Sequence, residues 1–183
     1  MTHKTEDVVD LLLAQHDEIR RLAAQVENNH GVVRRDAFDR LRRLLAVHET
    51  AEEEVVHPYA RRSIDHGEQV IEKRLREENA AKGVLARLEK LDCDSPEFEE
   101  MFAGFHKDIE AHARHEEREE FPKIRREASA EQLRGMATMV KVAEAVAPTH
   151  PHQGVESPTK NMALGPFAAV MDRAKDAIAK ARH

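Results

Sequence analysis

Two apolar stripes in this sequence are each interrupted by a histidine and a glutamate that lie one helical turn apart. In residues 38–59 and again in residues 98–119, core-type residues follow one another at steps of three and four. This spacing is typical of the core-facing seam of a bundled helix. The polar residues on the two seams are His48, Glu52, His112 and Glu116. Polar groups that face a core need partners, and a bound metal ion would satisfy both pairs.

The rest of the sequence predicts helices and no strands. Short connections join four long helical patterns, predicted over residues 5–28, 36–62, 68–91 and 95–126. Asp36 is a plausible cap for the second helix, and Ser95 followed by Pro96 is a typical helix start. We therefore expect an all-α fold, an up-down-up-down four-helix bundle.

A different pattern follows the bundle. We predict a fifth helix over residues 131–145, an irregular linker with four prolines and two glycines over 148–166, and a last amphipathic helix from Phe167 onward. The expected domains are a metal-binding bundle over residues 1–128 and a C-terminal helical extension over 129–183.

Composition excludes several classes of protein. The chain of 183 residues carries a net charge of -6, which argues against a general nucleic-acid binder. No apolar run approaches the roughly 20 residues of a membrane span. The single cysteine, Cys93, cannot form an internal disulfide or a thiolate zinc site. A cytoplasmic protein without a membrane partner is the expectation.

The inward polar residues are predicted to meet in one layer. In an up-down bundle, residues equally distant from a shared loop lie at the same height, and the predicted boundaries place one group from each helix at that height. On the third helix Glu78 fits best, although a small shift would favour Glu77 or Asn79 instead. The predicted ligand set is His16, His48, Glu52, Glu78, His112 and Glu116.

The donor types indicate which metals fit. Three carboxylates packed in a core would repel one another, and one or two cations remove that repulsion. Imidazole and carboxylate without thiolate suit iron or manganese, and bridging glutamates suit a site with two ions. We expect two bridged iron ions, with manganese or zinc as substitutes. The alternative is a structural bundle without metal, in which each polar residue has its own protein partner.

Several residues near the seam have a secondary interpretation. Tyr59 continues the stripe of the second helix, so it is either a plain core residue, a hydrogen-bond partner of the site or an additional ligand. Glu49 could approach the site from the side. His57 lies about 180° from His48 on a regular helix and is expected at the surface or in a loop. The acidic runs at 52–54 and 116–117 are expected to be mostly solvated, with one member of each pointing inward. Glu119 fits the core stripe better than His115 does.

At these residues the chain resembles the hemerythrin-like, HHE cation-binding proteins, over roughly residues 7–125. The segments that carry the resemblance are LLAQHDEI at 12–19, HETAEEEVVHP at 48–58 and HARHEEREEFP at 112–122. Members of the family usually have a histidine on the third helix, where this chain has Glu78. The pattern with its tail is similar to the actinobacterial branch, which implies peroxide, nitric oxide or iron handling.

Two functional hypotheses follow. In the first, a non-haem di-iron site reacts with O2 or H2O2, for example as a catalase-like activity, because a carboxylate-rich ligand set favours the ferric state. In the second, the site binds iron, oxygen or nitric oxide without turnover, and the C-terminal tail responds. We expect a monomer, or a homodimer formed through the C-terminal helix.

Overall fold

The computed structural model describes residues 7–146, and the predicted linker and last helix lie outside these residues. The described part is helical apart from short connections. Its elements are α1 (Val8–Asn28), α2 (Gly31–Ala51), η1 (Glu52–Val56), α3 (His57–Ser63), α4 (Gly67–Leu88), α5 (Pro96–His115), η2 (Glu116–Glu120), α6 (Phe121–Glu127) and α7 (Ala130–Val146).

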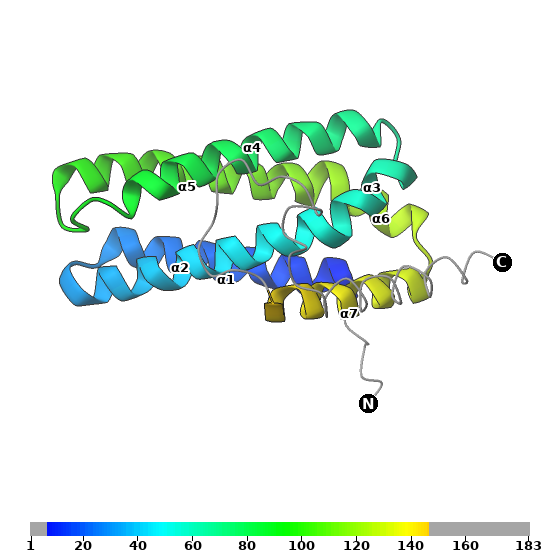
Figure 1. Cartoon of the computed structure of the whole chain (residues 1–183), viewed down its shortest axis with the longest axis horizontal. Helices are drawn as coiled ribbons and strands as arrows, with labels where there is room; N and C mark the ends of the chain where they lie inside the picture. Colours follow the sequence, from blue (N-terminus) through cyan, green and yellow to red (C-terminus); the bar gives the residue numbers. More distant parts are fainter. Residues whose placement is uncertain (1–6, 147–183) are drawn as a thin grey trace.

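The elements form the predicted four-helix bundle with an added helix. α2, η1 and α3 form one continuous rod, and α5, η2 and α6 form another; α1 and α4 complete the four (Figure 1). α7 packs against α1, α2 and η1 on one side of the bundle. Within residues 7–146 no helix is long and apolar enough to cross a membrane.

Local signals explain most of the helix boundaries. The Asp7 side chain accepts a hydrogen bond from the backbone N–H of Asp10, and Ser95 caps α5 in the same way. Gly31 has a φ of 60°, a left-handed conformation that glycine adopts at little cost, and it allows the tight turn from α1 to α2. The expectation that Asp36 caps the second helix is wrong, because α2 already begins at Gly31.

Each long rod contains one π-helical turn at the same place in its motif. The His57 N–H donates to the Glu52 carbonyl, and the Phe121 N–H donates to the Glu116 carbonyl, so both bonds span five residues. Such a turn holds one extra residue, and it rotates everything downstream by about 100° relative to a regular helix. The regular 3.6-residue pattern therefore fails beyond Glu52 and Glu116.

The two prolines of these rods stand at matching positions. Pro58 follows Glu52 by six residues, and Pro122 follows Glu116 by six residues. A proline ring crowds the carbonyl four residues before it, which favours an opened turn upstream. The repeated spacing is the sequence signal from which the π turns could have been inferred.

Two apolar clusters enclose the layer of polar residues. The first, here called the aromatic cluster, lies toward the α1–α2 turn and includes Phe38, Phe98, Phe102 and Phe105. The second, the α7-side cluster, includes Leu12, Val56, Phe121 and Met136 and is completed by α7. The polar layer is therefore sealed by apolar packing on both sides along the bundle.

Candidate metal centre

All six residues of the predicted ligand set come together between the two clusters. They form two groups that share the same pair of glutamates: His16, His48, Glu52 and Glu116 in one, and Glu52, Glu78, His112 and Glu116 in the other. Within each group, one ligand atom from every residue lies within 4.8 Å of all the others. α1, the two rods and α4 each contribute to the site.

The ligand atoms face one another at ion-pair distances without forming hydrogen bonds. The Nε2 atoms of His16 and His112 lie 3.2 Å from oxygens of Glu116, and His48 Nε2 lies 3.3 Å from Glu52. Both oxygens of Glu52 and of Glu116 are nevertheless buried without a hydrogen-bond partner. Adjacent donors at about 2.1 Å from one ion are separated by about 3 Å, which matches these distances. The residues thus fit a pair of cations that share two carboxylates.

A second layer of contacts fixes each histidine ring. Each Nδ1 faces an acceptor: His16 is 2.9 Å from Glu117, His48 is 2.6 Å from Gln15, and His112 is 3.0 Å from Glu77. When Nδ1 donates to such an oxygen, Nε2 keeps a lone pair directed at the site, as metal-bound histidines require. Arg20 and Arg74 in turn hold Glu117 and Glu77.

Without a cation, burial and neighbouring charges shift the pKa values of the clustered side chains away from their ordinary values. Burial and the neighbouring Glu116 raise the pKa of Glu52 well above its ordinary value. Burial opposes the ionisation of Glu116, but His112 and His16 hold the pKa of that carboxyl well below its usual range. Burial and His16 lower the pKa of His48 to about 3, which leaves it neutral, as a ligand must be. Two divalent cations would offset the charge of three ionised carboxylates.

Glu78 is the residue of α4 that faces the site, while Glu77 supports His112 from outside. Glu78 Oε1 lies 2.7 Å from His57 Nε2. The expectation that His57 lies at the surface is wrong, since its side chain is only 3% exposed. On a regular helix His57 would lie about 140° from Glu52, and the extra residue of the π turn reduces that angle to about 40°.

The π turn of the second rod likewise changes which glutamate faces the interior. Glu119 was expected on the core stripe, but its side chain is 49% exposed, whereas Glu120 is buried. Glu120 lies 3.5 Å from His57 Nδ1 and 4.0 Å from Arg74 Nε. Although burial lowers it, Glu78 and Glu120 raise the pKa of His57 well above its usual value. A buried ionic network therefore continues from Glu78 away from the metal groups.

The acidic run of η1 is buried, which contradicts its reading as mostly solvated. Glu53 and Glu54 are both buried, and the Lys82 ammonium donates to Glu53 and lies 3.6 Å from Glu49. Burial raises the pKa of Glu49 to about 8 and that of Glu53 to about 7, while Lys82 acts in the opposite direction. Lys82, on α4, thus ties this acidic segment to the bundle.

A small cavity adjoins the ligand groups. Its volume is about 30 Å³, and its lining combines ligand candidates with apolar groups: His16, His48, Glu78, His112, Ile19, Leu45, Ala81, Ile109 and Ala113, together with Glu49, Glu77 and Asp108. This is room for one molecule of the size of water or dioxygen. Tyr59 is absent from the lining, and it packs half buried against the α7-side cluster.

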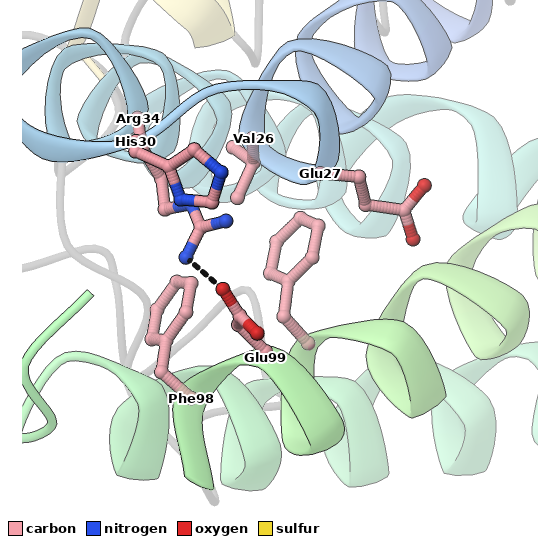
Figure 2. Close-up of a pocket in the computed structure, with 7 residues that line it drawn as sticks. Val26, Glu27, His30, Arg34, Phe98 and Glu99 are labelled. Carbon is pink, nitrogen blue, oxygen red and sulfur yellow. Dashed lines mark hydrogen bonds and ion pairs between the residues drawn. The ribbon is translucent and has the colours of Figure 1, made fainter. Parts of the chain in front are cut away.

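A larger hollow lies between the α1–α2 turn and α5, beside the aromatic cluster (Figure 2). It measures about 270 Å³ and is lined by residues of the α1–α2 turn and of α5, among them His30, Arg34 and Phe98. The buried Arg34 donates to the carbonyls of Asn29 and Cys93 and to Glu99. Its guanidinium thereby ties the turn to α5, a structural role that is separate from the metal groups.

Comparison with known proteins agrees with this geometry. Residues 7–124 match the hemerythrin HHE cation binding domain. The chain belongs to the hemerythrin family of HHE cation-binding domains. A hemerythrin-like protein of Schizosaccharomyces pombe is 23% identical over 98% of this chain and 90% of its own length.

Two further similarities are to a longer protein and to a solved structure. A DNA nickase of Nostoc is 25% identical over 75% of the chain, which spans only 39% of that relative. The crystal structure of a hemerythrin HHE cation-binding protein from Mycobacterium kansasii shares the fold, with a TM-score of 0.67, 20% identity and coverage of 76% and 86% of the two chains.

Proposed function

We propose that this HHE domain binds two bridged iron ions and reacts with hydrogen peroxide or dioxygen, with peroxide disproportionation as the main activity. The observation that carries the proposal is the pair of shared glutamates. Glu52 and Glu116 belong to both ligand groups, and neither has a hydrogen-bond partner for either oxygen. Carboxylates in this arrangement between helices of a bundle are typical of two-metal sites.

The donor chemistry supports iron, with manganese or zinc as substitutes. Three imidazoles and three carboxylates form a set without thiolate, which suits redox-active iron or manganese. When bound, iron supplies the one-electron steps that oxidise one peroxide to O2 and reduce another to two waters. The two half-reactions balance, so the activity consumes no outside reductant.

The protein's own residues do the remaining work. The apolar wall formed by Ile19, Leu45 and Ile109 limits the cavity to a small ligand and keeps bulk water out. Glu49 also lines the cavity, and its carboxyl is placed to take up or release a proton there. The Nδ1 contacts keep the three imidazoles oriented toward the cations.

The decisive experiment is metal analysis combined with peroxide assays. Protein reconstituted anaerobically with ferrous iron should hold about two ions per chain, show a charge-transfer band after oxidation, and evolve one O2 for every two H2O2 consumed. Iron-loaded protein that evolves no oxygen would exclude the disproportionation. Protein that takes up no transition metal would exclude the di-iron site itself.

A second candidate is a binding or sensing module, and one contact favours it. Gln15, whose amide oxygen faces His48 Nδ1, donates from its amide nitrogen to Glu144 on α7. A change at His48 is therefore two hydrogen bonds away from the helix that leads into the C-terminal tail. If iron or its small ligand signals through this route, protease cleavage of residues 148–166 should differ between apo and iron-loaded protein. Identical cleavage in both states would argue against signalling.

A further inference from the structure

Glu78 is the one residue of the predicted ligand set whose number of coordinating atoms is left open by its chemistry and its place in the site. An imidazole offers one nitrogen to the site, so His16, His48 and His112 each fill one position. Glu52 and Glu116 are shared by both groups. Glu78 belongs to one group only, and as a terminal carboxylate it could supply either one or two oxygens. The number of open positions therefore depends on Glu78.

The two oxygens of Glu78 have different surroundings. Oε1 accepts from His57 Nε2 at 2.7 Å, whereas Oε2 is buried without a hydrogen-bond partner. A charge-assisted hydrogen bond of this length, away from water, competes with a cation for Oε1. Oε2 is the oxygen that remains for the metal.

His57 is itself held from behind. Its Nδ1 lies 3.5 Å from Glu120, and Glu120 lies next to the buried Arg74. The ring is almost fully buried and follows directly after the π turn, where its backbone N–H donates to the Glu52 carbonyl. The imidazole is therefore fixed by both its backbone and its side chain, and Glu78 has to adapt to it.

We propose that His57 restricts Glu78 to a single coordinating oxygen, and so keeps a position open on the adjacent cation for a small anion or peroxide. The proposal rests on the proposed two-metal function. With one oxygen from each carboxylate, the Glu78 group would give a five-coordinate ion four donors and would leave one position for a ligand. The small cavity is lined by both Glu78 and His112, so a molecule within it has access to that side.

Without the hydrogen bond from His57, Glu78 would bind through both oxygens and close one position. His57 is thus a positioning residue, which acts through Glu78 and makes no contact with the substrate. A residue that served folding alone would change stability and leave ligand binding untouched.

Azide binding to the iron-loaded full chain tests the proposal without relying on turnover. His57→Leu should retain the wild-type iron content but bind azide about 10- to 100-fold more weakly in an absorbance titration. His57→Gln, which keeps an N–H donor, should recover most of the affinity. His106→Leu is the matched control, because His106 pairs with Glu27 away from the site. Wild-type azide affinity in His57→Leu would overturn the proposal.

Two further measurements keep the test decisive. If His57→Leu does not fold, Glu120→Ala removes the acceptor behind the ring and should also weaken azide binding, and unchanged affinity would count against the proposal. In cobalt-loaded protein, His57→Leu should weaken the visible d–d absorption as the coordination number rises; an unchanged spectrum would contradict it. Failure of the wild type to bind iron at all would instead refute the proposed function.

Discussion

The two ends of the bundle are built on different principles. The aromatic cluster packs Phe38, Phe98, Phe102 and Phe105 between regular α-helices, with ring centroids 5.2–6.2 Å apart. Beyond Glu52 and Glu116 the rods open into π turns, and charged groups such as His57 and Arg74 are buried beside the α7-side cluster. The first region stabilises the fold through apolar burial. In the second region the helices depart from regular α-helical geometry, and this departure positions the candidate ligands and the residues that contact them. π turns inside α-helices are frequent at functional sites for this reason.

The comparison predicts that the largest effect on metal binding comes from a shared glutamate. Glu52→Ala removes a ligand from both groups at once, so iron content should fall from about two ions per chain to well below one. The measurement is elemental analysis after anaerobic loading. Glu119→Ala is the control, since the exposed Glu119 stands where regular spacing expects a core residue. Equal loss of iron in both variants would contradict the conclusion that Glu52 faces the metal groups whereas the π turn places Glu119 outside them.

The aromatic end should respond in stability and not in metal content. Phe102→Ala removes a fully buried ring from the centre of the cluster and should lower the free energy of unfolding by about 3–5 kcal/mol. Urea unfolding of the metal-free protein measures this loss. Val32→Ala, at a position that is 83% exposed, should change stability by less than about 0.5 kcal/mol. A folded Phe102→Ala variant that lost its iron would break the separation between the two ends.

The metal end should also be the pH-sensitive one. In the absence of a cation, the raised pKa values of Glu52 and His112 keep protons on both groups near neutral pH. A cation must displace these protons, so its affinity should rise with pH, by up to about 100-fold per unit for two protons, and fall on acidification. Calorimetry of zinc binding in buffers with different ionisation enthalpies measures the protons released. No proton release would contradict the assignment of these ligands.

Regular helical spacing predicted much of this molecule because most of it is regular. The bundle topology and the common layer of six residues follow from seams that run unbroken as far as Glu52 and Glu116, and the preference for Glu78 over Glu77 on α4 followed from the same reasoning. Whether these residues bind iron remains a prediction.

Apart from the cap expected at Asp36, the errors lie within the π turns or directly after them. His57, Glu53 and Glu54 are buried against expectation, and Glu120 replaces Glu119 in the interior. His57 follows a π turn and the glutamates lie within one, and regular helical periodicity does not include the extra residue that such a turn holds. The paired prolines were visible in the sequence and mark the place of the π turns, but helical periodicity alone does not show the rotation that these turns introduce.

The smallest predicted effect is that of Pro58→Ala, which tests whether buried contacts or the proline ring maintains the π turn η1. If buried contacts of Glu52 and His57 maintain η1, Pro58→Ala should change stability by no more than about 1 kcal/mol and leave azide affinity at the wild-type level. The alanine restores a backbone N–H at residue 58, but the helical hydrogen bond that this N–H could form does not compensate for losing the buried contacts of His57. If the proline instead imposes the turn, Pro58→Ala should relax the rod to a regular helix, rotate His57 away from Glu78 and reproduce the weak azide binding expected of His57→Leu. Pro122→Ala is the matched control in the second rod, where Phe121 and not a histidine follows the π turn. If the first π turn affects azide binding through His57, Pro122→Ala should leave the azide affinity unchanged. A loss of azide affinity in Pro122→Ala would show that another residue is involved.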